Sequence, residues 1–209
     1  MSEAPPVRRG SLYVIAAPSG AGKTSLVKAV LGRDPALRVS VSHTTRKPRA
    51  HEVDGEHYHF VTIDEFKRLV AADAFLEHAQ VFDNFYGTSR AGVEALCGKG
   101  HDVILEIDWQ GAQQVRKAQP ECTTIFILPP SRRELESRLR NRQTDNEEVI
   151  QRRLRDCITD MSHYSEFDRV IVNEDFERAT TELLSLVRGG PGFEADRPQL
   201  RPLVTDLLG

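Results

Sequence analysis

The sequence predicts an α/β fold of the doubly wound type, built on a parallel sheet. Four short apolar runs rich in β-branched residues indicate buried strands, and helical signals follow each of them. A glycine-rich turn joins the first strand to the first helix, as in folds that bind phosphate at a helix N-terminus. The strands are expected at Leu12–Ala16, Val103–Ile107, Thr124–Leu128 and Val170–Val172.

The turn after the first strand, Ala17–Ser25, has the spacing of a phosphate-binding loop. Gly20 and Gly22 allow successive backbone N–H groups to point at an anion, and the helix that follows adds its positive N-terminal dipole. Lys23 is expected to follow the transferred phosphoryl group, and Thr24 to offer its hydroxyl to magnesium. Ala17 stands where a glycine is usual, which matters only if that residue needs a positive φ.

Helix signals follow each strand in turn. The first helix continues through the amphipathic run Ser25–Leu31, and a capping box at Ser131 and Glu134 starts another. Apolar residues from Ile150 to Met161 recur at helical spacing. A last helix is expected from about Asp175 to a glycine stop at 189–190.

Residues 41–88 differ from the rest of the chain in their side-chain pattern, which predicts an inserted antiparallel lobe. Polar and aromatic residues alternate there, as in Glu56–Val61, and Thr62 with Glu65 signals one short helix. The tail 189–209 is expected to be mostly loop, closed by a short helix at Leu203–Leu208, and no function is assigned to it.

Size and charge limit the classes of function. The 209 residues suit one domain of ordinary size or a compact core with a small lid. The net charge of −3, from 28 basic and 31 acidic residues, gives no global field for nucleic acid or an anionic membrane. Three scattered cysteines favour a reducing compartment, and no run approaches the ~20 apolar residues of a membrane span. We therefore expect a cytoplasmic protein with no nucleic-acid or membrane partner; a homo-oligomer stays open.

A phosphate loop alone is compatible with a GTPase, a motor or a kinase, so the second substrate has to be found elsewhere. In the lobe, Arg46 and Arg49 lie three residues apart on a proline-containing turn, a geometry suited to one phosphate. Two solvated surface arginines are the alternative. The hydroxyls of Tyr58 and Tyr86 could complete the cup, although a core tyrosine is the ordinary interpretation of either.

Several separated motifs give the chain a close resemblance to the guanylate kinase family. It covers about residues 10–188, and the bacterial members are the most similar. The motifs are Val41-Ser42-His43-Thr44-Thr45-Arg46-x-Pro48-Arg49, Gly55-x-x-Tyr58, Phe75-Leu76-Glu77-His78-Ala79, Asn84-x-Tyr86-Gly87-Thr88 and Ile107-Asp108-x-Gln110-Gly111.

The resemblance implies a P-loop nucleoside monophosphate kinase fold with ATP and GMP as substrates and Mg²⁺ as cofactor. It implies a core at 10–40 and 89–188, a GMP-binding lobe at 41–88 and a helical arginine lid at about 131–155. The ATP-binding residues would be Ala17, Pro18, Ser19, Gly20, Ala21, Gly22, Lys23 and Thr24. The GMP-binding residues would be Ser42, Glu77 and Thr88 at guanine, and Arg46, Arg49, Tyr58 and Tyr86 at the phosphate.

Guanine chemistry agrees with the role of Glu77. N1–H and the exocyclic amine of guanine are adjacent donors that one carboxylate accepts together, whereas adenine sets an acceptor against it. Glu77 is therefore the expected specificity determinant, and a solvated acid is the alternative.

Two acids end the second predicted strand. Glu106 and Asp108 alternate with apolar residues and share one face near the crevice where α/β folds bind ligands. By resemblance Glu106 faces GMP or the metal region, where the family commonly carries aspartate. Asp108 is expected at the metal with Thr24, or else as the N-cap of the helix that follows.

Three arginines are expected to bridge the two sets of phosphates. Arg138 and Arg142 lie four apart on one helix face, and Arg153 is expected to start the next helix. The family's lid arginines match them, so with Lys23 they are the predicted catalytic residues; a solvated helical hairpin is the alternative. Two rivals to a GMP kinase remain, a non-catalytic guanylate-kinase-like interaction domain and a kinase for another nucleoside monophosphate.

Overall fold

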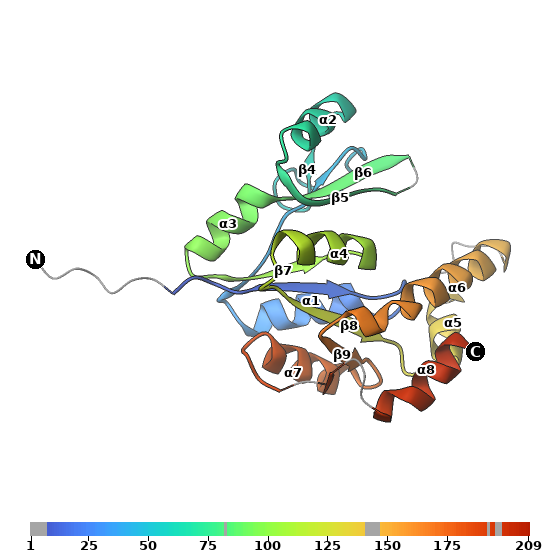
Figure 1. Ribbon diagram of the computed structural model, residues 1–209. Helices are drawn as coiled ribbons and strands as arrows, with labels where there is room; N and C mark the ends of the chain where they lie inside the picture. The colour runs from blue at the N-terminus through green and yellow to red at the C-terminus, as the bar shows by residue number, and fades with distance from the viewer. Residues whose placement is uncertain (1–7, 82, 141–146, 192, 195–197) are drawn as a thin grey trace, which may run out of the picture. The chain divides into compact units, whose positions relative to one another are not determined.

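The computed structural model describes residues 8–81, 83–140, 147–191, 193–194 and 198–209 (Figure 1). The chain forms two compact units. The first comprises Met1–Tyr13, Ala36–Leu105 and Gln110–Cys122. The second comprises Val14–Pro35, Glu106–Trp109 and Thr123–Gly209.

The second unit contains the phosphate loop and a largely parallel sheet. Strand β1 (Leu12–Ala16) ends in this unit, and the order of strands is β10-β9-β8-β1. β8 (Thr123–Leu128) and β9 (Arg169–Val172) pair in parallel, and the short β10 (Phe193–Glu194) adds to β9 antiparallel. The side chains of β8 from residue 124 to 128 are buried, as expected for a strand covered on both faces.

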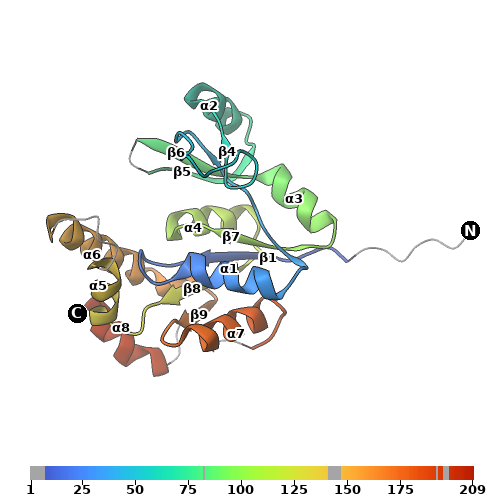
Figure 2. The same cartoon turned by 180° about the vertical axis from the view of Figure 1, so that it is seen from behind.

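The helices of this unit form two groups. α1 (Lys23–Arg33) packs beside α7 (Phe176–Leu186), as both views show (Figures 1 and 2). α6 (Glu147–Ser162) packs against both α5 (Arg132–Arg140) and the C-terminal α8 (Arg201–Leu208). The tail therefore ends in a helix that belongs to the packed structure, with Leu207 fully buried.

The first unit contains a parallel strand pair and a separate four-stranded sheet. β2 (Leu37–Val39) pairs in parallel with β7 (Asp102–Glu106). The second sheet has the order β4-β3-β6-β5. Its strands are β3 (His43–Thr44), β4 (His59–Phe60), β5 (Phe75–Val81) and β6 (Asn84–Ser89).

Helices complete the first unit. α2 (Ile63–Ala71) covers the four-stranded sheet through Phe66, whose ring stacks on Phe75 at 4.8 Å and Phe85 at 5.5 Å between centroids. α3 (Arg90–Gly98) follows β6, and α4 (Trp109–Ala118) follows β7, with Trp109 itself belonging to the second unit.

The predicted doubly wound class and its four strands are confirmed, each strand to within one residue. β2 and β10 were not predicted, because two or three residues are too few to show periodicity. The lobe is not wholly antiparallel, since β3 and β4 pair in parallel through a long connection. Arg153 lies in the middle of α6 and does not start it, because that helix already begins at Glu147.

Candidate active site

The phosphate loop has the backbone that its glycines predict. Gly20 and Gly22 have φ of 87° and 94°, and Gly22 is the N-cap of α1. A Cβ on Gly22 would collide with the side-chain amide of Asn173, so this residue needs glycine for space as well as for conformation. Among described non-glycine residues only Asp73 has a positive φ, which explains why alanine is tolerated at Ala17.

Side chains from three other elements hold this loop. The Asn173 amide Nδ2 donates to the Ala21 carbonyl at 2.7 Å, and the Cys157 thiol donates to the Ser19 carbonyl at 3.3 Å. A Cβ on Gly20 would touch Leu135 at 3.2 Å and Leu139 at 3.3 Å, so α5 packs directly against the loop. Side chains from α5, from α6 and from the residue after β9 thus hold the backbone of the loop in place.

The lysine and threonine of the loop lie beside the end of β7. Lys23 Nζ donates to the Ile107 carbonyl at 2.9 Å, and Thr24 Oγ1 donates to Glu106 Oε2 at 3.1 Å. Burial lowers the pKa of the Lys23 ammonium, and the charges of Glu106, Asp108 and Asp160 act in the opposite direction. The structure therefore brings together four predicted site residues of this unit, namely Lys23, Thr24, Glu106 and Asp108. Within this group Glu106 contacts Thr24.

The Asp108 segment is held by the end of α6. The ring of His163 stacks on Trp109, with centroids 3.4 Å apart and planes 9° from parallel. The Asp160 carboxylate hydrogen-bonds to the Trp109 side chain. Burial, with the nearby charge of Asp108, raises the pKa of Asp160 to about 6. Asp160 was not predicted. The sequence contained one signal for it, a charged residue three positions after the apolar helix position Cys157 and so on a similar side of the helix.

The predicted catalytic arginines have different surroundings. Arg138 Nε donates to Glu134 Oε1 at 2.9 Å, and Nη2 donates to the Asn173 carbonyl at 3.4 Å. Arg138 thus lies next to a residue that itself holds the phosphate loop. Arg153 is on α6, one turn before Cys157. The predicted residue Arg142 lies outside the described residues.

In the first unit the predicted guanine ligands Glu77 and Thr88 form a buried pair. Thr88 Oγ1 donates to Glu77 Oε1 at 2.6 Å, and the two residues are 0% and 5% exposed respectively. A β-bulge between Phe75 and Glu77 shifts the register so that Glu77 lies opposite Thr88. Tyr86 is two residues before Thr88 on β6 and so shares its face of the sheet.

The predicted phosphate ligands also gather in this unit. The Arg46 guanidinium carbon is 5.4 Å from the ring centroid of Tyr58, and the Tyr86 hydroxyl hydrogen-bonds to the Arg46 side chain. The two tyrosine rings meet edge-on at 6.0 Å. Glu52, which was not predicted, hydrogen-bonds to both nitrogens at the tip of Arg46.

The remaining predicted residues of this unit are less constrained. Arg49 is exposed, and its backbone N–H donates to Glu52 Oε2 at 2.7 Å. Ser42 is partly buried directly before β3, and its carbonyl accepts from the His59 N–H at 2.9 Å. The structure therefore brings Arg46, Tyr58 and Tyr86 into one group, with Arg49 attached to it through Glu52.

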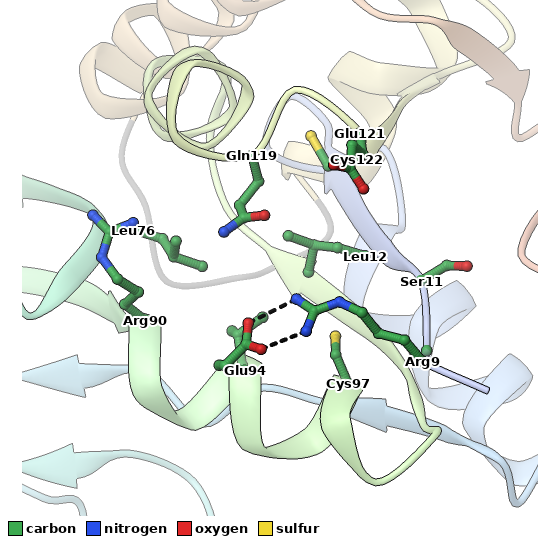
Figure 3. A pocket seen from close by; sticks show the side chains of 12 residues that line it. Arg9, Ser11, Leu12, Leu76, Arg90, Glu94, Cys97, Gln119, Glu121 and Cys122 are labelled. Carbon is green, nitrogen blue, oxygen red and sulfur yellow. Dashed lines mark hydrogen bonds and ion pairs between the residues drawn. The ribbon is translucent and has the colours of Figure 1, made fainter. Parts of the chain in front are cut away.

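A separate cavity of about 280 Å³ lies in the first unit and includes none of the predicted site residues. Figure 3 shows Arg9 crossing it to pair through both terminal nitrogens with Glu94 of α3. Cys97 and Cys122 also line it, and both are buried free thiols. Because its main charges neutralise each other, we assign no ligand to this cavity.

In the described parts of the chain, no group of three or more His, Cys, Asp or Glu side chains is arranged to hold a metal ion. None of the helices seen there has the length and apolar character needed to cross a bilayer.

Comparison with known proteins gives one consistent result. The family model for guanylate kinase matches residues 9–189. The guanylate kinase of Alkalilimnicola ehrlichii is 54% identical over 201 residues, which are 96% of this chain and 99% of that protein. The Escherichia coli enzyme of the same name is 56% identical over 182 residues, 86% of this chain and 88% of that one. The crystal structure of guanylate kinase from Anaplasma phagocytophilum aligns over 94% of both chains, with a TM-score of 0.68 and 34% identity.

Proposed function

The chain belongs to the guanylate kinase family, and we propose that it transfers the γ-phosphoryl group of ATP to the phosphate of GMP, giving ADP and GDP. The observation that carries this proposal is the buried Glu77–Thr88 pair on the same sheet face as Tyr86. A buried carboxylate there suits the two adjacent donors of guanine. We place the reaction in the cytoplasm, as a step of purine nucleotide metabolism that recycles GMP.

The donor site in this proposal is the phosphate loop. Its backbone N–H groups would cradle the phosphates of ATP at the N-terminus of α1, and Lys23 would follow the transferred group. The bonds from Asn173 and Cys157 to loop carbonyls support this role, because they orient the loop without using the N–H groups that a phosphate needs.

The oxygen atoms near Lys23 fit a magnesium ion. Thr24 supplies a hydroxyl, and Glu106 and Asp108 supply carboxylates, which are the hard oxygen donors that Mg²⁺ prefers alongside water and phosphate. When bound with ATP, the ion would neutralise charge on the phosphate oxygens. The contact between Glu106 and Thr24 supports a place for Glu106 in the metal region.

The transfer needs alignment and positive charge more than covalent help from the protein. The attacking oxygen of GMP is already anionic, so no general base is required. Arg138, Arg142 and Arg153 would stabilise the charge that spreads over the transferring phosphoryl group. Arg46, Arg49, Tyr58 and Tyr86 would hold the acceptor phosphate in place.

A coupled assay with ATP, magnesium and each nucleoside monophosphate in turn tests this function. Turnover with GMP and little with AMP, CMP or UMP is the expected result. Tight binding of GMP without turnover would instead indicate an interaction domain. Equal turnover of several monophosphates would indicate a kinase of different specificity.

A further inference from the structure

Glu52 connects the two arginines of the proposed acceptor cup. Its Oε1 accepts from Arg46 Nη2 at 2.7 Å, and its Oε2 accepts from Arg46 Nη1 at 2.9 Å. The same Oε2 accepts from the backbone N–H of Arg49 at 2.7 Å. Glu52 lies between the motif that ends at Arg49 and the one that begins at Gly55, and the proposed function assigns it no role.

The Glu52 carboxylate is well enclosed and firmly held. Its side chain is 7% exposed, and its own N–H donates to the Arg49 carbonyl at 3.0 Å, which closes the turn between the two residues. The hydrogen bonds from Arg46, and then that from the Arg49 backbone, lower the pKa of Glu52 to about 2. Moving the side chain away would leave the Arg46 guanidinium, which is 20% exposed, without its carboxylate partner.

The geometry leaves Arg46 able to bind an anion. A guanidinium has five N–H donors, and Glu52 with the Lys47 carbonyl takes three of them, two on Nη1 and one on Nη2. The other two, Nε–H and the second Nη2–H, lie along the opposite edge, which is the edge suited to a second forked contact. Because a guanidinium has no acceptor, the Tyr86 hydroxyl accepts from Arg46, and a phosphate oxygen at this edge would share or replace that contact.

We propose that Glu52 is a positioning residue for the acceptor phosphate: it stays bound to the tip of Arg46, fixes the backbone of Arg49, and so presents the Nε edge of Arg46 to the phosphate of GMP. This inference rests on the proposed function. The alternative is that the Glu52 carboxylate occupies the phosphate position and must move away when GMP binds. The contacts favour the positioning role, because Glu52 binds the two terminal nitrogens of Arg46 and its backbone is held by the turn.

The test uses Glu52→Gln in the full chain, with Glu56→Gln as a matched control on the exposed side of the same loop. Glutamine places an NH₂ donor against a guanidinium donor, so the forked contact is lost. In Glu52→Gln we expect the KM for GMP to rise about ten- to a hundredfold. The KM for ATP and kcat should stay within about threefold of wild type, and the control should match wild type.

A second measurement separates positioning from a general loss of structure. The ratio of the Kd of guanosine to the Kd of GMP, measured by calorimetry, reports the contribution of the phosphate alone. We expect this ratio to fall about tenfold in Glu52→Gln, and Glu52→Asp to restore part of it. Equal weakening of both ligands, or tighter binding of GMP, would overturn the inference. Wild-type protein that binds GMP but does not turn it over would contradict the proposed function and leave this ratio to decide the role of Glu52.

Discussion

The hydroxyl of Thr88 donates to Oε1 of Glu77 at 2.6 Å, across two antiparallel strands that a β-bulge has shifted by one residue. Without the bulge, the register that pairs Phe75 with Ser89 would place Glu77 opposite Gly87, which has no side chain to donate. The bulge therefore creates the polar pair on which the proposed selectivity depends.

Glu77→Gln should reduce selectivity for GMP. The amide keeps one acceptor but turns a donor toward the donors of guanine, so kcat/KM for GMP should fall about a hundredfold. The ratio of kcat/KM for GMP to that for AMP, from steady-state assays, measures the effect. Glu65→Gln, an exposed change on α2, is the control. An unchanged ratio in Glu77→Gln would reject its role in specificity.

Lys23→Ala should abolish most turnover and leave GMP binding nearly intact. The lysine is the only residue of the loop proposed to follow the transferred group, so its loss should lower kcat by roughly a thousandfold or more. Rapid-quench measurement of GDP formation gives the rate, and calorimetry gives the Kd of GMP. Lys28→Ala, exposed on the same helix, should behave as wild type. Near-normal rates in Lys23→Ala would show that the donor phosphates bind elsewhere.

Asp206→Ala should destabilise the protein through the first turn of α5. Asp206 Oδ2 accepts from the Arg132 N–H at 3.1 Å, beside the N-cap bond from the Glu134 N–H to Ser131. Loss of a helix-capping acceptor should lower the free energy of unfolding by about 1 kcal/mol in urea denaturation. Asp206→Asn keeps an acceptor oxygen and should remain close to wild type. Equal stability of Asp206→Ala and wild type would mean that the tail does not cap α5.

The Glu52–Arg46 pair should make stability depend on acid pH. The pKa of Glu52 is about 2 in the folded protein against 4.5 ordinarily, so between these values the unfolded state binds more protons. The pair therefore stabilises the protein fully above pH 4.5, and this contribution declines as the pH falls toward 2. The difference in unfolding free energy between wild type and Glu52→Gln, measured at several pH values from 7 to 3, should shrink below pH 4.5. A pH-independent difference would mean that the carboxylate is not paired in this way.

The features that sequence predicts best here are local ones. β1 and β8 are continuous apolar runs, and the caps at Thr62, Ser131 and Asp175 each follow from a side chain that can accept from an N–H three residues on. Such signals lie within a few residues, so a single sequence contains them.

The features that it misses depend on tertiary packing. Asn173 reaches Ala21 across 152 positions of the chain, and no local pattern pairs them, although a polar residue directly after a parallel strand is a partial signal. The bulge that places Glu77 opposite Thr88 could not be predicted from the sequence either, because the strand that begins at Phe75 starts with three buried residues in succession and shows no alternation there. Glu52 looks in the sequence like an ordinary acidic residue of a loop, and only the folded turn shows its contacts with Arg46 and Arg49.

The most direct test of the account follows the phosphorus atom itself. ATP labelled at the γ-phosphate is mixed with the protein, Mg²⁺ and unlabelled GMP, and the products are separated. Direct transfer predicts that the label appears at the β-phosphate of GDP in step with ADP, with little released as inorganic phosphate. Label found mainly in inorganic phosphate, or ADP formed without labelled GDP, would contradict the account.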